Sequence, residues 1–298
     1  MICNRCPRKC NAERTETANP NGVCQMPLLP RVARASLHFG EEPCISGTNG
    51  SGTVFFSGCS LGCVYCQNGE ISHQNIGYDL TANQLTELFK RLEEQGAHNI
   101  NLVNPTHFSH ALLKAFDRYR PKIPIVWNSG GYDSETVLSE CRDFIDIYLM
   151  DLKYSSPEKA KRYSNAGDYP SVAQNAVLTA YRNQPNCEFD ENGLMKRGLI
   201  VRHLILPQAT KEAIACFDWV RQNVPNAYFS IMSQYVPCYK SDTFPEINRK
   251  VTKREVEKVL SYICEFDFQN VFYQENGCAD ESFIPDFSPE NNIDLCRL

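Results

Sequence analysis

Short runs of β-branched and aromatic residues alternate along the chain with longer stretches in which apolar residues recur at helical spacing. Six such runs lie beyond residue 50, over 53–56, 99–103, 123–127, 145–153, 199–206 and 228–235. The clearest helix is predicted over 81–95. Its residues Leu85, Leu88 and Leu92 fall on one face, and Gly96 follows as a stop signal. This alternation of strands and helices predicts parallel βαβ units.

Six βα units are too few to close an eight-stranded barrel. The pattern therefore predicts an α/β fold built as a partial (β/α)6 TIM-like barrel, with an open doubly wound sheet as the alternative. In both architectures, polar residues at the carboxyl ends of the strands line the functional site. Further helices are predicted over 109–119, 134–142, 211–223 and 252–266, and a last strand over 270–275.

The first 50 residues differ from the rest of the chain. They show little periodicity and are rich in Cys, Pro and Asn. We therefore divide the chain into a Cys-rich N-terminal head over 1–50, a barrel over 51–275 and a polar C-terminal tail over 276–298.

Composition narrows the class of protein. The chain is 42% hydrophobic and 22% charged, which supplies a sizeable core and argues against a disordered chain. Its net charge of -5 disfavours a generic nucleic-acid binder, which is usually basic. No apolar run reaches membrane-spanning length, and the N-terminus lacks the apolar stretch of a secretory signal, so we expect a cytoplasmic protein without a membrane partner. The 15 cysteines, an odd number in a long periodic chain, favour metal-bound thiolates in a reducing compartment.

Three cysteines lie on one loop directly after the first predicted strand. Cys59, Cys63 and Cys66 are spaced C-x3-C-x2-C. Three thiolates can hold three irons of a cubane cluster and leave the fourth iron open for a ligand. Gly58 and Gly62 allow the backbone to curl around such a group. The alternative is a structural zinc site that takes a fourth cysteine from elsewhere in the chain.

A second group of cysteines lies in the head. Cys3, Cys6, Cys10 and Cys24 are spaced C-x2-C-x3-C-x13-C. Four thiolates fit either a tetrahedral zinc site or a second iron–sulfur cluster, and the spacing does not separate the two. Bound metal would supply folding energy to a head that has few apolar residues. Unligated, reduced cysteines are the third interpretation.

The cysteine loop also carries a family resemblance. The pattern C-x3-C-x-aromatic-C, with Tyr65 before the third cysteine, resembles the signature of the radical S-adenosylmethionine (SAM) superfamily. Over the wider chain, CNRCPRKC, ARASLHFGEEPCISG, NLVNPTH, YLMDLKY, VRHLILP and SQYVP resemble pyruvate formate-lyase activating enzyme-like proteins, in particular their PflX-type branch. The resemblance implies a [4Fe-4S] cluster on Cys59, Cys63 and Cys66, with SAM on the fourth iron and Tyr65 beside the adenine. Reductive cleavage of SAM would give a 5′-deoxyadenosyl radical that abstracts hydrogen from a substrate.

The same resemblance suggests SAM contacts at two strand ends. Asn104 and Thr106 follow the second predicted strand, where related enzymes carry a Gly-Gly-Glu-like segment that this chain lacks. Their side-chain oxygens would accept the corresponding hydrogen bonds, although Thr106 also suits a helix cap. Asn128 and Ser129 end the third strand and would face SAM or substrate, with a simple polar turn as the alternative.

Three later strands carry the other candidates. Asp151 and Lys153 lie two residues apart and share one face; the family resemblance places them near cofactor and substrate, and a self-contained ion pair is the alternative. Arg202 would bind the SAM carboxylate through its forked guanidinium, whereas His203 points the other way and is expected to pack. Gln234 is expected to contact cofactor or substrate.

The function implied by the resemblance is activation or modification of a protein or peptide by hydrogen abstraction. It would require a low-potential electron donor such as flavodoxin or ferredoxin. Two alternatives remain at this point: a radical SAM enzyme that acts on a small metabolite or nucleoside, and a zinc-stabilised binding module without catalytic activity.

Overall fold

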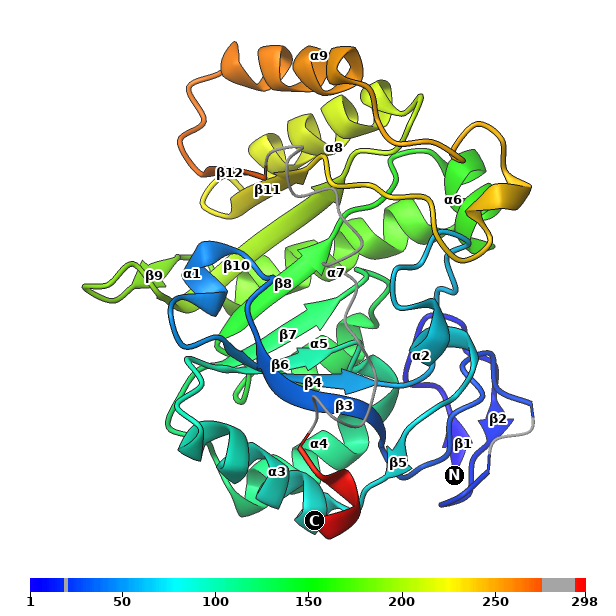
Figure 1. The fold of residues 1–298 in the computed structure, drawn as a ribbon, viewed down its shortest axis with the longest axis vertical. Helices are drawn as coiled ribbons and strands as arrows, with labels where there is room; N and C mark the ends of the chain where they lie inside the picture. The colour runs from blue at the N-terminus through cyan, green and yellow to red at the C-terminus, as the bar shows by residue number, and fades with distance from the viewer. Residues whose placement is uncertain (19–20, 275–292) are drawn as a thin grey trace.

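The computed structural model describes residues 1–18, 21–274 and 293–298. Most of the predicted tail, 276–298, lies outside the described residues. One large sheet organises the rest of the chain (Figure 1). Within the described ranges, its parallel part contains seven strands in the spatial order of the sequence: β4 (Ser51–Phe56), β6 (Ile100–Val103), β7 (Ile125–Ser129), β8 (Ile147–Asp151), β10 (Met195–Leu204), β11 (Tyr228–Met232) and β12 (Val271–Gln274).

The predicted strands and the partial barrel are confirmed. Each of the six predicted runs overlaps one parallel strand, and the strand predicted over 270–275 is β12. The order of strands runs from β12 at one margin to β5 (Tyr78–Asp79) at the other, so the sheet formed by the described residues does not close. It is a partial α/β barrel.

Strand β3 (Arg31–His38) was not predicted from the sequence. It pairs antiparallel with β4, and β5 pairs antiparallel with β3. The segment RVARASLH is rich in Ala and Arg, which have no strong preference for strands, and only its partners in the fold reveal it. The predicted head over 1–50 therefore contributes a strand to the main sheet. The first residues form a separate two-stranded ribbon of β1 (Ile2–Cys3) and β2 (Ala12–Glu13), and β9 (Glu188–Phe189) pairs with β10.

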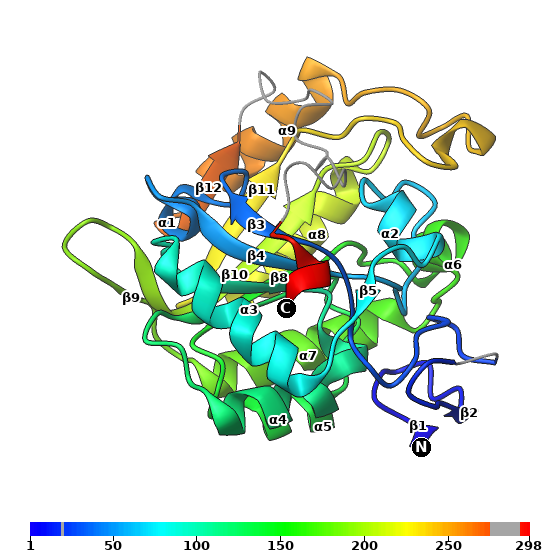
Figure 2. The ribbon, with the colours of Figure 1, turned by 60° about the horizontal axis from the view of Figure 1, so that its bottom comes forward.

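Helices α3, α4, α5 and α7 cover the outer face of the sheet, and α8 packs against α9 towards the β12 margin (Figures 1 and 2). The helices are α1 (Pro43–Ser46), α2 (Gly69–His73), α3 (Ala82–Glu94), α4 (Ser109–Arg118), α5 (Glu135–Cys141), α6 (Pro157–Ser164), α7 (Tyr169–Asn183), α8 (Thr210–Asn223) and α9 (Lys253–Cys264), with short 3₁₀ turns at Thr106–Phe108, Ser241–Thr243 and Leu295–Arg297. None of the helices in the described part of the chain combines the length and apolar character needed to cross a membrane.

The five predicted helices are present, and local capping explains where two of them begin. Thr81 and Thr252 each accept a hydrogen bond from a backbone N–H three residues later, in a reciprocal capping box. Helices α6 and α7 were not predicted. Helix α7 buries small residues such as Ala173, Ala176 and Ala180, so its buried face has little large apolar content to mark it in the sequence.

Side chains on the inner face of the sheet form two layers. Val126, Leu149 and Ile200 pack against Ile45 of α1 and close the base of the barrel with apolar side chains. Two residues further along each strand, towards its carboxyl end, the same face carries Asn128, Asp151 and Arg202, because side chains on one face of a strand repeat every second residue. The candidate site begins at this polar layer.

Candidate active site

Arg202 is the centre of the polar layer. Its Nε donates to Oδ1 of Asp151 over 2.9 Å, its Nη1 to Oε2 of Glu41 over 3.0 Å, and its Nη2 to Oδ1 of Asn128 over 2.6 Å. The side chains of Arg202 and Glu41 are only 14% and 8% exposed. A planar guanidinium suits three partners that lie in different directions. The predicted site residue is therefore already engaged by groups of this chain.

Glu41 is a site residue that the sequence analysis did not single out. It lies in the loop after β3, and its Oε1 accepts hydrogen bonds of 2.9 Å from Nδ2 of Asn101 and from Nδ2 of Asn128. Together with its bond to Arg202, this carboxylate connects the antiparallel margin of the sheet with β6, β7 and β10. The only signal in the sequence is the pair of acids in FGEEP, and a separation of 161 residues from Arg202 gives no indication of contact.

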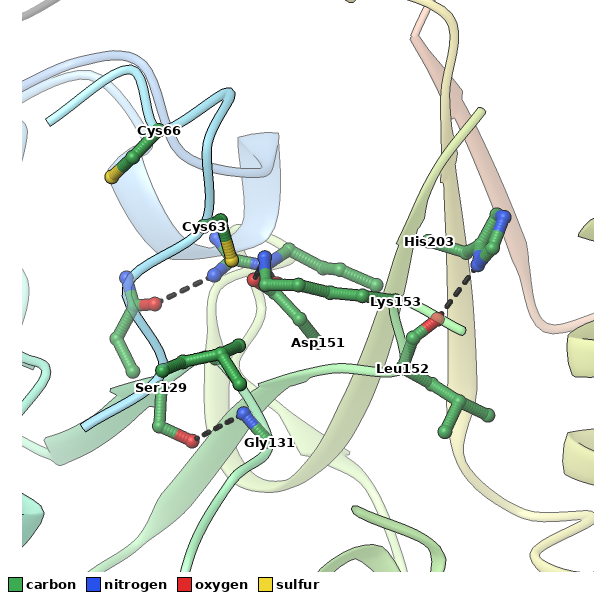
Figure 3. Close-up of polar contacts among 12 residues, drawn as sticks. Cys63, Cys66, Ser129, Gly131, Asp151, Leu152, Lys153 and His203 are labelled. Atoms are coloured by element: carbon green, nitrogen blue, oxygen red, sulfur yellow. Dashed lines mark hydrogen bonds and ion pairs between the residues drawn. The ribbon is translucent and has the colours of Figure 1, made fainter. Parts of the chain in front are cut away.

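Asp151 and Lys153 form an ion pair on the rim of the same layer (Figure 3). Burial opposes ionisation of Asp151, but the adjacent charges of Arg202 and Lys153 hold the pKa of its carboxyl below the usual value. Burial likewise opposes the charge on Lys153, yet Asp151 raises the pKa of its ammonium above the usual value. His203 points away from the site, as predicted, and its Nδ1 lies 2.7 Å from the carbonyl oxygen of Leu152.

The three loop cysteines line one cavity together with the polar layer. Cys59, Cys63 and Cys66 share its wall with Asp151, Lys153 and Arg202, and the sulfur of Cys63 points toward Lys153 (Figure 3). Gly58 and Gly62 have φ of 76° and 67°, a region that favours glycine, so the predicted need for glycine in this curl is confirmed.

Each of the three sulfurs has a polar neighbour. The backbone N–H of Leu61 donates to Cys59 over 3.3 Å, the hydroxyl of Ser164 donates to Cys63 over 3.0 Å, and the hydroxyl of Ser72 lies 3.1 Å from Cys66. Burial raises the pKa of the Cys63 thiol to about 12 and that of Cys66 to about 11. Coordination to a metal deprotonates such thiols outright.

The candidates on the second and third strand ends have partners within the chain. Nδ2 of Asn104 donates to the carbonyl oxygen of Gly58 over 2.6 Å and so fastens the cysteine loop to the end of β6. The hydroxyls of Thr106 and Ser129 both donate to the buried carboxylate of Asp133. Asn104, Asn128 and Ser129 line the cavity; Thr106 is buried outside its lining.

Tyr65 also lines the cavity but is held by other aromatic residues. Its ring contacts Tyr154, Tyr163 and Tyr235 edge-on, and its hydroxyl donates to the hydroxyl of Tyr154 over 2.8 Å. Tyr65 is 6% exposed and lines the cavity, and its position beside the adenine stays a prediction.

The donor set fits a [4Fe-4S] cluster and SAM. Three thiol side chains on one loop supply one ligand to each of three irons. Beyond them, Oε1 of Gln234 and Oδ1 of Asn68 are buried and have no hydrogen-bond partner among the described residues, and both side chains line the cavity. Buried acceptors of this kind suit the amino or hydroxyl groups of a bound ligand.

The head cysteines lie near one another and beside the cysteine loop. Burial raises the pKa of the Cys6 thiol to about 12, and the nearby sulfurs of Cys24, Cys3 and Cys10 raise it further. Arg14 is fully buried, and its Nη1 lies 3.4 Å from the sulfur of Cys3. In the part of the chain that the structure describes, no three His, Cys, Asp or Glu side chains converge on a single ion position.

Comparisons with known proteins indicate the class of enzyme. Residues 53–189 match the model of the radical SAM superfamily. An uncharacterized protein of Methanocaldococcus jannaschii is 28% identical over 284 residues, which covers 91% of this chain and 76% of that protein. Residues 53–189 thus carry a radical SAM domain, and the chain is an enzyme of the radical SAM type, with a [4Fe-4S] cluster and SAM as its cofactors.

Solved structures support the fold. Streptococcus suis SuiB bound to S-adenosylmethionine superimposes with a TM-score of 0.51 at 14% identity, over 73% of this chain and 48% of SuiB. SuiB bound to its precursor peptide SuiA gives a TM-score of 0.51 at 12% identity, over 73% of this chain and 47% of SuiB. The chain thus spans about half the length of these structures, and at this identity the likeness concerns the fold alone.

Proposed function

We propose that this radical SAM enzyme activates or modifies a protein or peptide by hydrogen abstraction. The observation that carries the proposal is the open sheet. The cavity takes its walls from His38 and Glu41 near the β3 margin and from Leu204 and Met232 on β10 and β11, while the sheet that bears them does not close within the described residues. An incomplete barrel leaves the side of the site accessible to a polypeptide loop. SuiB, with the same fold, has been crystallised with a precursor peptide, which supports this use of the fold.

When bound, the cluster and SAM supply the one-electron cleavage that yields a hydrogen-abstracting radical. This chain's own residues orient the reactants. We assign Cys59, Cys63 and Cys66 to the cluster, and Tyr65 to the adenine. Further SAM or substrate contacts are assigned to the polar groups that line the cavity: Asn104, Asn128, Ser129, Asp151, Arg202 and Gln234.

Asp151 and Lys153 are proposed to position SAM and the substrate. The ion pair holds the Lys153 ammonium near the sulfur of Cys63, so a positive charge lies beside the wall that carries the cluster ligands. Thr106 is proposed to act only through its neighbours, because its hydroxyl donates to Asp133, which in turn accepts a hydrogen bond from Ser129. The electron would come from a low-potential flavodoxin or ferredoxin, and the head cysteines would hold zinc or a second cluster.

The test uses reconstituted enzyme under anaerobic conditions with SAM and dithionite. Soluble extract of the source organism is separated by ultrafiltration into macromolecules and small molecules, and 5′-deoxyadenosine is quantified after addition of each fraction. We expect the macromolecular fraction to stimulate 5′-deoxyadenosine formation and protease treatment to remove the stimulation. Stimulation by the small-molecule filtrate alone would favour a metabolite or nucleoside substrate and contradict the proposal.

A further inference from the structure

Three buried hydroxyls form a chain that ends on a cluster ligand. The hydroxyl of Tyr65 donates to that of Tyr154 over 2.8 Å, the hydroxyls of Tyr154 and Ser164 lie 2.7 Å apart, and Ser164 donates to the sulfur of Cys63 over 3.0 Å. Tyr65, Tyr154 and Ser164 are 6%, 1% and 1% exposed, so water does not compete for these bonds.

The state of Cys63 fixes the direction of the whole chain. A thiolate bound to iron only accepts hydrogen bonds, so the single hydroxyl hydrogen of Ser164 is directed to the sulfur. The oxygen of Ser164 then accepts from Tyr154, and Tyr154 accepts from Tyr65. The hydroxyl of Tyr154 also lies near the sulfur of Cys63. The hydroxyls of Ser164 and Tyr154 thus each have one donor and one acceptor role filled.

The other sulfur contacts are weaker candidates for such a role. The hydroxyl of Ser72 lies near Cys66, but it also donates to the carbonyl oxygen of Asn68, so one hydrogen is shared between two acceptors. The donor to Cys59 is the backbone N–H of Leu61, which no side-chain substitution removes. Among these three contacts, the undivided side-chain hydrogen bond to a cluster ligand is therefore that of Ser164.

The position of Ser164 is itself fixed from two sides. It is the last residue of α6, and Asn165 follows in the left-handed conformation that ends the helix. Arg8 of the head donates to the carbonyl oxygens of Ser164 and Asn165, over 3.0 and 2.7 Å, and to that of Ser60 in the cysteine loop over 2.7 Å. Arg8 thus connects the end of α6 to the cysteine loop and fixes their relative position.

From this geometry we propose that Ser164 raises the reduction potential of the cluster through its hydrogen bond to Cys63, and that Tyr154 and Tyr65 are positioning residues that orient its hydroxyl. A hydrogen bond to a ligand sulfur stabilises the more electron-rich, reduced cluster, and such bonds are among the factors that set cluster potentials. One electron from the external donor enters the cluster in this step, and no bond is made or broken. The proposal rests on the cluster and is independent of the substrate.

The test is anaerobic potentiometry of the reconstituted protein without SAM or substrate, with the reduced cluster followed by electron paramagnetic resonance. Ser164→Ala and Tyr154→Phe are compared with wild type and with Tyr163→Phe. Tyr163 is the matched control, because its ring also contacts Tyr65 but its hydroxyl donates to Glu246, away from the chain of hydroxyls. Iron content is measured for each variant.

We expect Ser164→Ala to lower the ratio of reduced to oxidised cluster at a fixed solution potential by about threefold to tenfold, the range for loss of one hydrogen bond. A tenfold change corresponds to about 59 mV in a one-electron couple. Tyr154→Phe should shift the potential in the same direction by less, and Tyr163→Phe should leave it unchanged.

An unchanged or more positive potential in Ser164→Ala overturns the proposal, as does an equal shift in Tyr154→Phe and Tyr163→Phe. If Ser164→Ala fails to hold four irons, Tyr154→Phe decides: a negative shift supports the proposal and no shift overturns it. Since neither SAM nor substrate is present, failure of the proposed protein or peptide activity would leave this measurement unaffected.

Discussion

The carboxylate of Glu41 lies 3.0 Å from Nη1 of Arg202 and joins the loop after β3 to the middle of the parallel sheet. Both charges are nearly buried, and each has further partners: Arg202 bonds to Asp151, and Glu41 accepts from Asn101 and Asn128. Removing one member of a buried, hydrogen-bonded ion pair leaves the other charge buried without a partner, which is strongly destabilising. Each member of the Glu41–Arg202 pair is therefore needed for stability while the other is present.

Glu41→Ala should therefore lower the free energy of unfolding by about 3 kcal/mol. Urea unfolding under anaerobic conditions measures this, and a double-mutant cycle with Arg202→Ala should give a coupling of about 1–3 kcal/mol. The control is Glu140→Ala, which removes the partner of Arg5 in an ion pair where Glu140 is 40% exposed, and should cost about 1 kcal/mol or less. Equal losses of unfolding free energy in Glu41→Ala and Glu140→Ala would show that the buried Glu41–Arg202 pair contributes no more than an exposed ion pair.

Gly58 lies where the head packs against the cysteine loop. A Cβ added there would stand 2.3 Å from Cγ of Met26 and 2.8 Å from the carbonyl oxygen of Cys24, at a φ of 76°. Gly58→Ala should displace the loop and reduce both thermal stability and the iron bound per chain. Gly193→Ala is the matched control, because Gly193 has a φ of 75° and nothing within 4 Å of an added Cβ.

Gly193→Ala should show only the backbone cost of the left-handed conformation, about 1–2 kcal/mol. Gly58→Ala should exceed that cost and lose iron, whereas Gly193→Ala should retain it. Iron analysis and thermal melts of both variants make the comparison. Equal losses in the two proteins would mean that the close approach of the head at Gly58 has no effect on the cluster loop.

We expect three buried histidines to make the protein less stable in mild acid. Burial lowers the pKa of His203 to about 4, of His110 to about 4 and of His107 to about 3. In the unfolded chain each of these histidines has a pKa of about 6.5. Between that value and the lower pKa of the folded state, only the unfolded chain binds the proton, so the free energy of unfolding falls as the pH falls. Each histidine should cost about 1 kcal/mol of stability between about pH 7 and about pH 5.5.

Urea unfolding at the two pH values measures this loss of stability. His203→Gln should make the loss smaller by about 1 kcal/mol, the contribution of one histidine. His203 suits the test because its ring lies away from the candidate site. A pH dependence that stays the same in the variant would show that folding does not lower the pKa of His203.

The head cysteines give a fourth prediction. If Cys3, Cys6, Cys10 and Cys24 bind one metal centre, substitution of any one by Ala should remove the same increment of metal, because each thiolate is a ligand of the same centre. Elemental analysis of the four variants, for zinc and iron separately, also identifies the metal. Unequal losses, or none, would indicate unligated thiols.

The sequence was sufficient to predict those parts of the fold that rest on local patterns. Apolar runs and helical spacing located the parallel strands and α3, α4, α5, α8 and α9. The spacing of Cys59, Cys63 and Cys66 was sufficient to predict the loop that we propose holds the cluster, because three candidate ligands on one short loop need no tertiary information. Strand β3 and helices α6 and α7 were missed because their buried side chains are largely small, and their assignment depends on what packs against them.

Apart from the cysteine loop, the sequence brought candidate site residues together only where a single strand carries them. The sequence placed Asp151 and Lys153 together and predicted that Arg202 binds the SAM carboxylate, but it gave no indication of the partners of Arg202 within the chain. In the structure Arg202 has three partners from other elements, including Glu41, which is 161 residues away. Ser164 was missed for the same reason: its contact with Cys63 joins residues 101 positions apart. Contacts of this kind depend on the register of the sheet.

The central claim is that Cys59, Cys63 and Cys66 carry the cluster that cleaves SAM, and one measurement tests it most directly. Reconstituted protein is incubated anaerobically with SAM and dithionite, and 5′-deoxyadenosine is quantified. Wild type should form 5′-deoxyadenosine, and Cys63→Ala should form none, because three thiolate ligands are the minimum for a cubane cluster with one iron open to SAM. Cys141→Ala, which alters a buried thiol on α5 away from the cavity, should behave as wild type. Formation of 5′-deoxyadenosine by Cys63→Ala, or its absence in wild type with four irons bound, would contradict the account.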